Sequence, residues 1–205
     1  MTPTKLRFDG AAEVCGKLDH PGLATDMPIW VDHTRDETTV DQARIEDVLD
    51  GLDLVGRAIL HVGVGNSGLA KRFAPRVELV DGLTVSQPEK KLADSLGIPN
   101  YTVHLLSKYG REFVAHVDNR YDYVVDNNLA SFACCKYHFF RMLDNYLWCM
   151  RPGARILTDQ RGMDFTVEDD PLWRLTYDDL VGLEGLFPVT AGALTDTVYE
   201  LRIRS

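Results

Sequence analysis

Apolar and polar positions along residues 38–203 recur in blocks whose spacing predicts strands and helices in turn. The clearest block runs from Ala58 to Phe73, where a short apolar run ends in a glycine-rich turn and then continues with helical spacing. This pattern is typical of a buried strand that leads into a helix in a nucleotide-binding α/β unit. Gly63 and Gly65 would let the backbone bend tightly and approach a ligand, although a tight connection that binds nothing has the same pattern.

The same criteria predict further strands and helices along the chain. The other predicted strands are Arg76–Val85, Tyr101–Leu106, Tyr121–Asp126 and Ala154–Asp159, with a final hairpin of Leu186–Thr190 and Thr197–Ile203 joined by a turn that contains Gly192. The predicted helices run from a Thr38 or Thr39 cap to Gly51, from a Ser86 cap to Gly97, and over Tyr109–His116, Ser131–Met150 and Pro171–Leu183. Strands that alternate with helices and end in an antiparallel pair predict a doubly wound α/β sheet whose ligand lies at the carboxyl ends of the strands.

Residues 1–36 lack this regular pattern, and their scattered glycines and prolines indicate an arm or lid. We expect one α/β domain over residues 37–205, with no internal repeat and no linker. Within the arm, the apolar and aromatic patch from Pro28 to His33 either packs on the domain as a staple or closes over a ligand.

Composition narrows the classes of function. The chain has 205 residues, of which 26% are charged and 45% hydrophobic, as in an ordinary globular domain. Its formal net charge of −9 argues against broad electrostatic binding to nucleic acid. No apolar run is long enough to cross a membrane, and the N-terminus lacks the apolar core of a signal peptide, so we expect a cytoplasmic protein.

The four cysteines form no C-x-x-C pair, so neither a zinc site nor a disulfide framework is expected. We expect buried free thiols that behave as small hydrophobic groups. The cysteines are Cys15, Cys134, Cys135 and Cys149.

Four segments resemble, in the same order, motifs of the class I S-adenosylmethionine-dependent methyltransferases. They are Ile59–Ser67, Gly82–Ser86, Asn119–Asn127 and Leu147–Leu157. The resemblance extends from about Ala58 to the C-terminus and implies a Rossmann-like, mostly parallel sheet of seven strands whose last strand is antiparallel. It also implies S-adenosylmethionine as the cofactor and S-adenosylhomocysteine as the product.

The resemblance assigns each motif a part of the cofactor. The first motif would enclose the methionine and ribose portion, the tip of the second strand would accept the ribose hydroxyls, and the end of the third strand would reach the adenine. The implied cofactor-binding residues are His61, Gly63, Gly65, Asn66, Ser67, Asp81, Thr84, Ser107, Asp126 and Asn127.

Three positions at which this family commonly has a carboxylate carry other residues. His61 replaces the acid of the first motif, Thr84 stands at the tip of the second strand, and Ser107–Tyr109 follow the third. His61 is either an atypical cofactor residue or a buried histidine satisfied by backbone. Strand alternation separates Asp81 from Thr84, and we favour Thr84 for the ribose. Either this is a divergent subfamily that uses hydroxyl and amide contacts, or its cofactor site is impaired.

Methyl transfer from a sulfonium depends mainly on alignment and exclusion of water. A hydroxyl or amine acceptor must also lose a proton, and the candidate catalytic bases are Asp126, His138 and His33. Asn127 and Asn128 either orient the acceptor or complete a turn. No metal ligands are expected.

The leading hypothesis is methyl transfer to an oxygen or nitrogen of a small molecule, with the arm supplying part of the acceptor pocket. A catalytically inactive, methyltransferase-like binding subunit is one alternative, because the expected carboxylates are missing. A nicotinamide-dependent oxidoreductase is less favoured, because no clear acid follows the glycines at the usual ribose position. We expect no nucleic-acid or membrane partner, and the sequence leaves open whether the chain forms a homo-oligomer.

Overall fold

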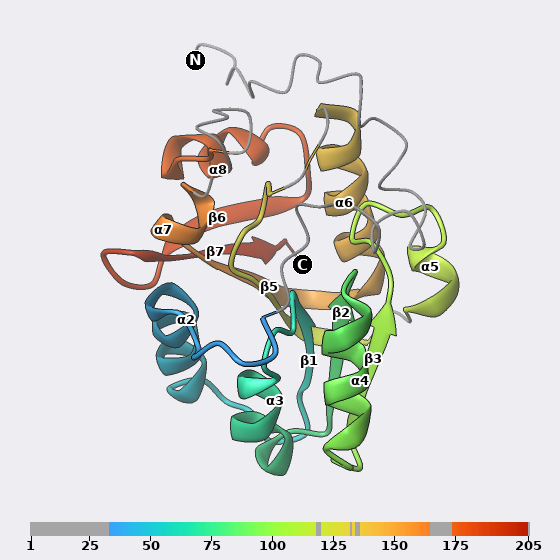
Figure 1. Ribbon diagram of the computed structural model, residues 1–205. Helices are drawn as coiled ribbons and strands as arrows, with labels where there is room; N and C mark the ends of the chain where they lie inside the picture. Colours follow the sequence, from blue (N-terminus) through green and yellow to red (C-terminus); the bar gives the residue numbers. More distant parts are fainter. Residues whose placement is uncertain (1–32, 118–119, 132, 134–135, 165–173, 205) are drawn as a thin grey trace.

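The computed structural model describes residues 33–117, 120–131, 133, 136–164 and 174–204, and a seven-stranded sheet forms its centre (Figure 1). The strands are β1 (Ala58–Val62), β2 (Leu79–Thr84), β3 (Tyr101–Leu105), β4 (Tyr121–Asp126), β5 (Met150–Asp159), β6 (Val189–Ala193) and β7 (Val198–Ile203). Their order is β3-β2-β1-β4-β5-β7-β6, with β1 to β5 parallel and β7 antiparallel to both of its neighbours. This confirms the predicted doubly wound, mostly parallel sheet with an antiparallel C-terminal hairpin.

The strands of the sheet centre are buried on both faces, because alternate residues pack into two different hydrophobic clusters. The helices are α2 (Val40–Asp50), α3 (Gly68–Phe73), the 3₁₀ helix η2 (Ala74–Arg76), α4 (Gln87–Ser95), α5 (Phe113–His116), α6 (Lys136–Cys149), α7 (Gln160–Met163) and α8 (Tyr177–Leu183). In β1, Ile59 joins the cluster formed with α2 and α3, whereas Leu60 joins the cluster formed with α5, α6 and α8.

Hydroxyl side chains cap the starts of three of these helices. Thr39 accepts the Gln42 amide at the start of α2, and Ser86 accepts the Glu89 amide at the start of α4, as the sequence predicts. Thr176 and Asp179 form a reciprocal capping box that starts α8 at Tyr177. The cap therefore explains why the described part of the predicted Pro171–Leu183 helix begins only at Tyr177.

Several predicted boundaries were wrong. Helix α6 begins at Lys136 and not at Ser131, because the Ser131 hydroxyl and amide both donate to the Asn128 carbonyl in a turn. Gly192 lies within β6, paired with Glu200, so the hairpin turn comes after it. The predicted fifth strand also begins earlier, at Met150, which pairs with Tyr121 before a register shift.

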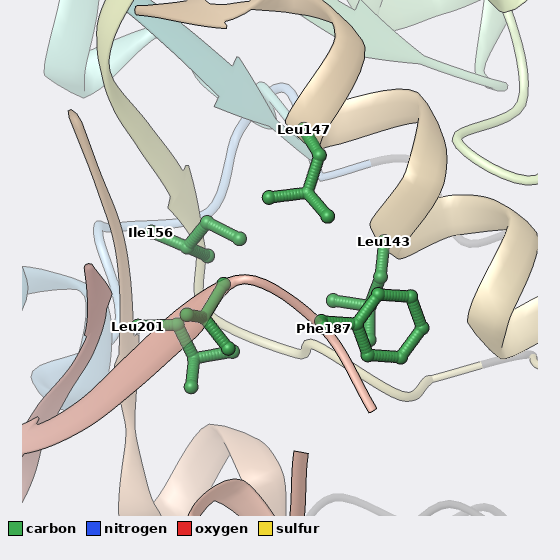
Figure 2. Close-up of a pocket in the computed structure, with 6 residues that line it drawn as sticks. Leu143, Leu147, Ile156, Phe187 and Leu201 are labelled. Carbon is green, nitrogen blue, oxygen red and sulfur yellow. The ribbon is translucent and has the colours of Figure 1, made fainter. Parts of the chain in front are cut away.

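Apolar side chains of α6 pack on the antiparallel end of the sheet. Figure 2 shows Leu143 and Leu147 of α6 turned toward Ile156 of β5 and Leu201 of β7, with Phe187 beside them. A ligand site needs polar groups that orient its ligand, and the side chains in this contact are all hydrocarbon. We therefore assign the contact to the core.

Cys149 at the end of α6 is a free, buried thiol, and burial raises its pKa to about 12, which agrees with the expected packing role. Cys15, Cys134 and Cys135 lie outside the described residues. Among the residues that are described, no helix is long and apolar enough to cross a membrane.

Candidate functional site

A cavity of about 830 Å³ opens at the carboxyl ends of β1, β2 and β4. It lies beside the point where the strand order reverses, because β1 has β2 on one side and β4 on the other. Connections leave such a pair of strands in opposite directions, and a crevice forms between them. The volume is typical of small-molecule binding sites. This cavity is therefore the candidate active site.

The loop between β1 and α3 forms one wall. Gly63, Gly65 and Asn66 line the cavity, and the two glycines have positive φ angles of 76° and 48°. Residues with side chains are strained at these angles, so the loop presents bare backbone to the cavity. Asn66 fixes the loop, since its Oδ1 accepts the Gly68 amide and its Nδ2 donates to the Asp36 carbonyl, both at 2.7 Å.

Ser67 lies beneath this loop and does not line the cavity. Its φ of 59° turns the residue into the core, where it is fully buried. The Tyr101 hydroxyl donates to Ser67 Oγ at 3.1 Å. The predicted cofactor contact of Ser67 is therefore corrected to a role in supporting the loop.

The tip of β2 carries a carboxylate that the strand itself lacks. Glu89 of α4 is only 4% exposed, lines the cavity, and accepts hydrogen bonds from the Thr84 hydroxyl at 2.6 Å and the Gly65 amide at 3.3 Å. A glutamate three residues after a serine cap usually binds the amide of that serine. Here the Ser86 amide donates to Thr84 Oγ1 at 3.0 Å, so the Glu89 carboxylate is free to face the cavity. Burial raises the pKa of Glu89.

Asp81, the second choice for the ribose, does not line the cavity. Its carboxylate accepts hydrogen bonds from the Tyr121 hydroxyl and from Arg120 Nη2, the latter at 2.7 Å. Thr84, in contrast, lines the cavity as expected. Asp81 is therefore corrected to a core ion pair.

His61 lines the cavity at the end of β1 and is 3% exposed. Burial lowers its pKa to about 4, so the imidazole is neutral near pH 7. Within the described part of the chain its Nδ1 has no hydrogen-bond partner. The interpretation of a histidine satisfied by backbone is therefore wrong, and His61 brings an unpaired polar group to the site.

Asp126 at the tip of β4 lines the cavity, but both of its oxygens are engaged. Lys108 Nζ donates to them at 2.9 and 3.2 Å, and the Tyr146 hydroxyl donates to Oδ2 at 2.7 Å. Lys108 also donates to the carbonyls of Asn128 and Leu129. With both oxygens engaged in these bonds, Asp126 holds the strand tip in place, and its role as a base stays a prediction.

Ser107, which follows β3, lines the cavity beside Lys108 as the resemblance implies. Its Oγ accepts the Tyr109 amide at 3.2 Å, and its carbonyl accepts the Gly110 amide at 3.0 Å. These bonds form the turn that displaces the start of α5 to Phe113. The Ser107 side chain thus has a structural partner at the cavity wall.

Asn127 lines the cavity and is held by three elements. Its Nδ2 donates to Asp41 Oδ2 of α2, and its carbonyl accepts from the Thr158 hydroxyl of β5 at 3.1 Å. A Cβ on Gly162 of α7 would lie 2.2 Å from both the carbonyl oxygen and Oδ1 of Asn127. Its side-chain orientation is therefore fixed by contacts far apart in the sequence.

The two candidate histidine bases lie in different places. His33 lines the cavity, its Nδ1 is 2.8 Å from Asp36 Oδ2, and its Cβ would be 3.8 Å from a Cβ on Gly65. It therefore covers the glycine loop. His138 is buried in α6 and does not line the cavity, which corrects its predicted catalytic role.

The chain matches no protein-family model and no curated protein sequence. It is similar to the solved structure of the N-methyltransferase NodS from Bradyrhizobium japonicum WM9, with 11% sequence identity over 80% of this chain and 96% of that one and a TM-score of 0.60. It is also similar to a SAM-dependent methyltransferase from Aquifex aeolicus, with 16% identity over 98% of this chain and 97% of that one and a TM-score of 0.55. The chain has the class I S-adenosylmethionine-dependent methyltransferase fold. The [4+2]-cyclase SpnF is also similar, with 18% identity over 86% of this chain and 72% of that one and a TM-score of 0.56. Sequence identities this low show the fold alone.

Within this methyltransferase fold, the cavity is strongly acidic. Among the described residues its lining contains six carboxyl side chains and two basic side chains, a formal excess of four negative charges. Five of these carboxylates were not among the predicted site residues: three come from helices α2 and α4, and two precede α2. The carboxylates are Asp36, Glu37, Asp41, Glu46, Glu89 and Asp126, and the cations are Lys108 and Arg161.

Proposed function

We propose that the chain transfers a methyl group from S-adenosylmethionine to a small-molecule acceptor. One observation carries this proposal: the switch-point cavity joins the bare backbone of Gly63 and Gly65 to a buried carboxylate, Glu89, at the tip of β2. A solved NodS structure of similar fold contains S-adenosyl-L-homocysteine, which supports the same class of cofactor here.

The residues present fit this cofactor at its ribose. Glu89 Oε2 is bound by Thr84 and Gly65, and the His33 backbone amide also lies within hydrogen-bonding reach of this carboxylate. A carboxylate accepts hydrogen bonds from neighbouring hydroxyls, as a ribose diol requires. Glu89 thus supplies, from a helix, the acid that Thr84 lacks at the strand tip.

The charge of the cavity also fits. S-adenosylmethionine carries a sulfonium, an ammonium and a carboxylate, and when bound it supplies an electrophilic methyl group. The acidic lining attracts a ligand with net positive charge. Neutral His61 offers a ring nitrogen as a hydrogen-bond acceptor, and Glu46, buried in the same lining, adds a carboxylate.

The chain would promote transfer by holding the acceptor and excluding water. The glycine loop closes one side and His33 covers it, while Asp126 and Lys108 lock the strand tip from below. Asn127, fixed by Asp41 and Thr158, stands where an acceptor would be oriented.

Calorimetric titration of the purified chain with S-adenosylhomocysteine tests the proposal. We expect one binding site per chain, and no heat with reduced nicotinamide dinucleotide. Absence of binding by both S-adenosylhomocysteine and S-adenosylmethionine would overturn the proposal. Binding together with no transfer of labelled methyl to any acceptor in a metabolite extract would support the inactive-subunit alternative in its place.

A further inference from the structure

We propose that the methyl acceptor is an amine and that Asp41 holds its nitrogen beside the tip of β4. This inference rests on the proposed function, since it concerns the acceptor half of the same cavity. It selects nitrogen over oxygen and names the residue that recognises it.

Asp41 reaches the cavity from the first turn of α2 and is 8% exposed. Its Oδ2 accepts from Asn127, which directly follows the last residue of β4. No hydrogen bond to Asp41 Oδ1 is found among the described residues. A buried carboxylate is costly without partners, so this oxygen is suited to a cationic donor from a ligand.

The orientation of Asp41 is fixed through Asn127. The Thr158 hydroxyl holds the Asn127 carbonyl, and Gly162 leaves just enough room for the Asn127 side chain, since a Cβ there would lie 2.2 Å from Oδ1. With its amide nitrogen directed at Asp41, Asn127 keeps the carboxylate at the cavity wall. A site that holds its recognition group in place in this way is preorganised for a ligand.

A second observation, independent of the acids, points to a ligand in this cavity. His61 is 3% exposed and lines the same wall, and its Nδ1 has no partner in the part of the chain that is described. Buried polar groups are normally hydrogen-bonded, so an unpaired one at a cavity wall indicates a partner supplied by a ligand.

The charge balance favours a cationic acceptor. The described part of the lining has a formal excess of four negative charges, and a bound cofactor of net charge +1 would leave a formal excess of three. Acceptors with a carboxylate or phosphate would be repelled by this field, whereas an ammonium would be attracted.

The side chains also favour nitrogen over a hydroxyl. A hydroxyl acceptor needs a base, yet Asp126 is paired with Lys108, and His138 lies outside the cavity. His33 is paired with Asp36 above the glycine loop. An amine that has released its proton to solvent needs no such base at the moment of transfer.

In the transfer step, the lone pair of the neutral amine nitrogen forms the bond to the methyl carbon while the carbon–sulfur bond breaks and its electron pair remains on sulfur. The positive charge therefore passes from sulfur to nitrogen, and the methylated nitrogen then releases a proton. Asp41 lies where this charge develops, and a fixed carboxylate there stabilises the transition state.

The test uses an S-adenosylhomocysteine analogue in which a carbon that carries an amino group replaces the sulfur. Its ammonium projects toward the acceptor position. By calorimetry, the unaltered chain should bind this analogue more tightly than S-adenosylhomocysteine. Asp41→Asn can still accept the hydrogen bond from Asn127 but loses the negative charge. It should lower the affinity for the analogue about 10-fold, as expected for a charged pair, and the affinity for S-adenosylhomocysteine less than about 2-fold. Asp47→Asn, an equal charge change on an exposed position of α2, should weaken neither.

The outcomes separate the two proposals. If S-adenosylhomocysteine does not bind the unaltered chain, the proposed function fails. If it binds but Asp41→Asn weakens both ligands equally, or neither, the inference about Asp41 is overturned. In a second measurement, labelled methyl transferred into a metabolite extract should be retained on a cation exchanger, and label in the neutral or anionic fraction would overturn the amine assignment.

Discussion

Replacing Glu89 by glutamine should move stability and ligand binding in opposite directions. Burial raises the pKa of Glu89 in the folded chain above its unfolded value. The stability that this group contributes is therefore present below the unfolded pKa and is lost as the pH rises through the folded pKa. At pH 7, above the unfolded pKa, the raised pKa of Glu89 costs stability, so the uncharged Glu89→Gln variant should melt at a higher temperature.

The effect on binding follows from the contacts of the two carboxylate oxygens. In Glu89→Gln, the amide oxygen can still accept from Thr84, at 2.6 Å in the parent, and from the Gly65 amide, at 3.3 Å. The second position becomes an NH₂ group that cannot accept a ribose hydroxyl. Loss of one charged hydrogen bond costs about 1.5–3 kcal/mol. We therefore expect S-adenosylhomocysteine to bind roughly 10- to 100-fold more weakly.

Calorimetry and thermal unfolding at pH 7 would measure both effects on the same preparation. Asp94→Asn provides the control, because Asp94 lies on the same helix and pairs with Lys90 at the surface, so its loss should change neither quantity much. Unchanged affinity in Glu89→Gln would place the ribose elsewhere. A melting temperature several degrees lower would show that Glu89 is a structural carboxylate and would refute the argument from burial.

Three further predictions concern the loop, the strand tip and the buried histidine. Gly65→Ala and Gly56→Ala each place a side chain at a positive φ, 48° and 66° respectively. Each variant should lose about 1–2 kcal/mol of unfolding free energy. Calorimetry should find weaker S-adenosylhomocysteine binding only in Gly65→Ala. Equal affinities would move the ligand away from this loop. Gly162→Ala places a Cβ 2.2 Å from the Asn127 carbonyl oxygen and should lower the melting temperature by roughly 2–12 °C. An unchanged melting temperature would mean that α7 shifts freely. Burial lowers the pKa of His61 to about 4, so the stability that this group contributes is present above pH 6.5 and is lost as the pH falls toward 4. In urea unfolding, the unaltered chain should therefore lose about 2 kcal/mol more unfolding free energy than His61→Gln between pH 7 and pH 5. Equal losses in the two proteins would contradict this.

Much of the fold follows from local sequence signals. The predicted fourth strand, Tyr121–Asp126, is observed with the same bounds because its apolar run is bounded by clear breaks. The Thr39 and Ser86 caps are also observed, since capping depends only on residues within one turn. Boundaries set by tertiary contacts were missed, such as the start of α6 beyond Ser131, which a turn with Asn128 holds.

The site was harder to predict for the same reason. The glycine loop and Thr84 are local features, and they line the cavity as expected. The pairing of Lys108 with Asp126 joins residues 18 positions apart, and the bond between Asp41 and Asn127 joins residues 86 apart. No periodicity or spacing rule connects such positions, so the engagement of Asp126 and the approach of Asp41 required the structure.

Under the proposed function, the carboxylate missing from the tip of β2 has a physical explanation other than an impaired site. The acid absent from position 84 is replaced in space by Glu89, which reaches the same strand tip because Thr84 occupies the Ser86 amide. Thr84 at the strand tip and Glu89 in the first turn of α4 thus act as one unit. Under this interpretation the Thr84→Val variant should lose cofactor affinity even though Thr84 carries no charge, because the Ser86 amide would then compete for the Glu89 carboxylate and draw it from the cavity. Thr84→Ser, which keeps the hydroxyl, should bind S-adenosylhomocysteine as the parent does, and equal affinities in the valine and serine variants would show that the two residues act separately.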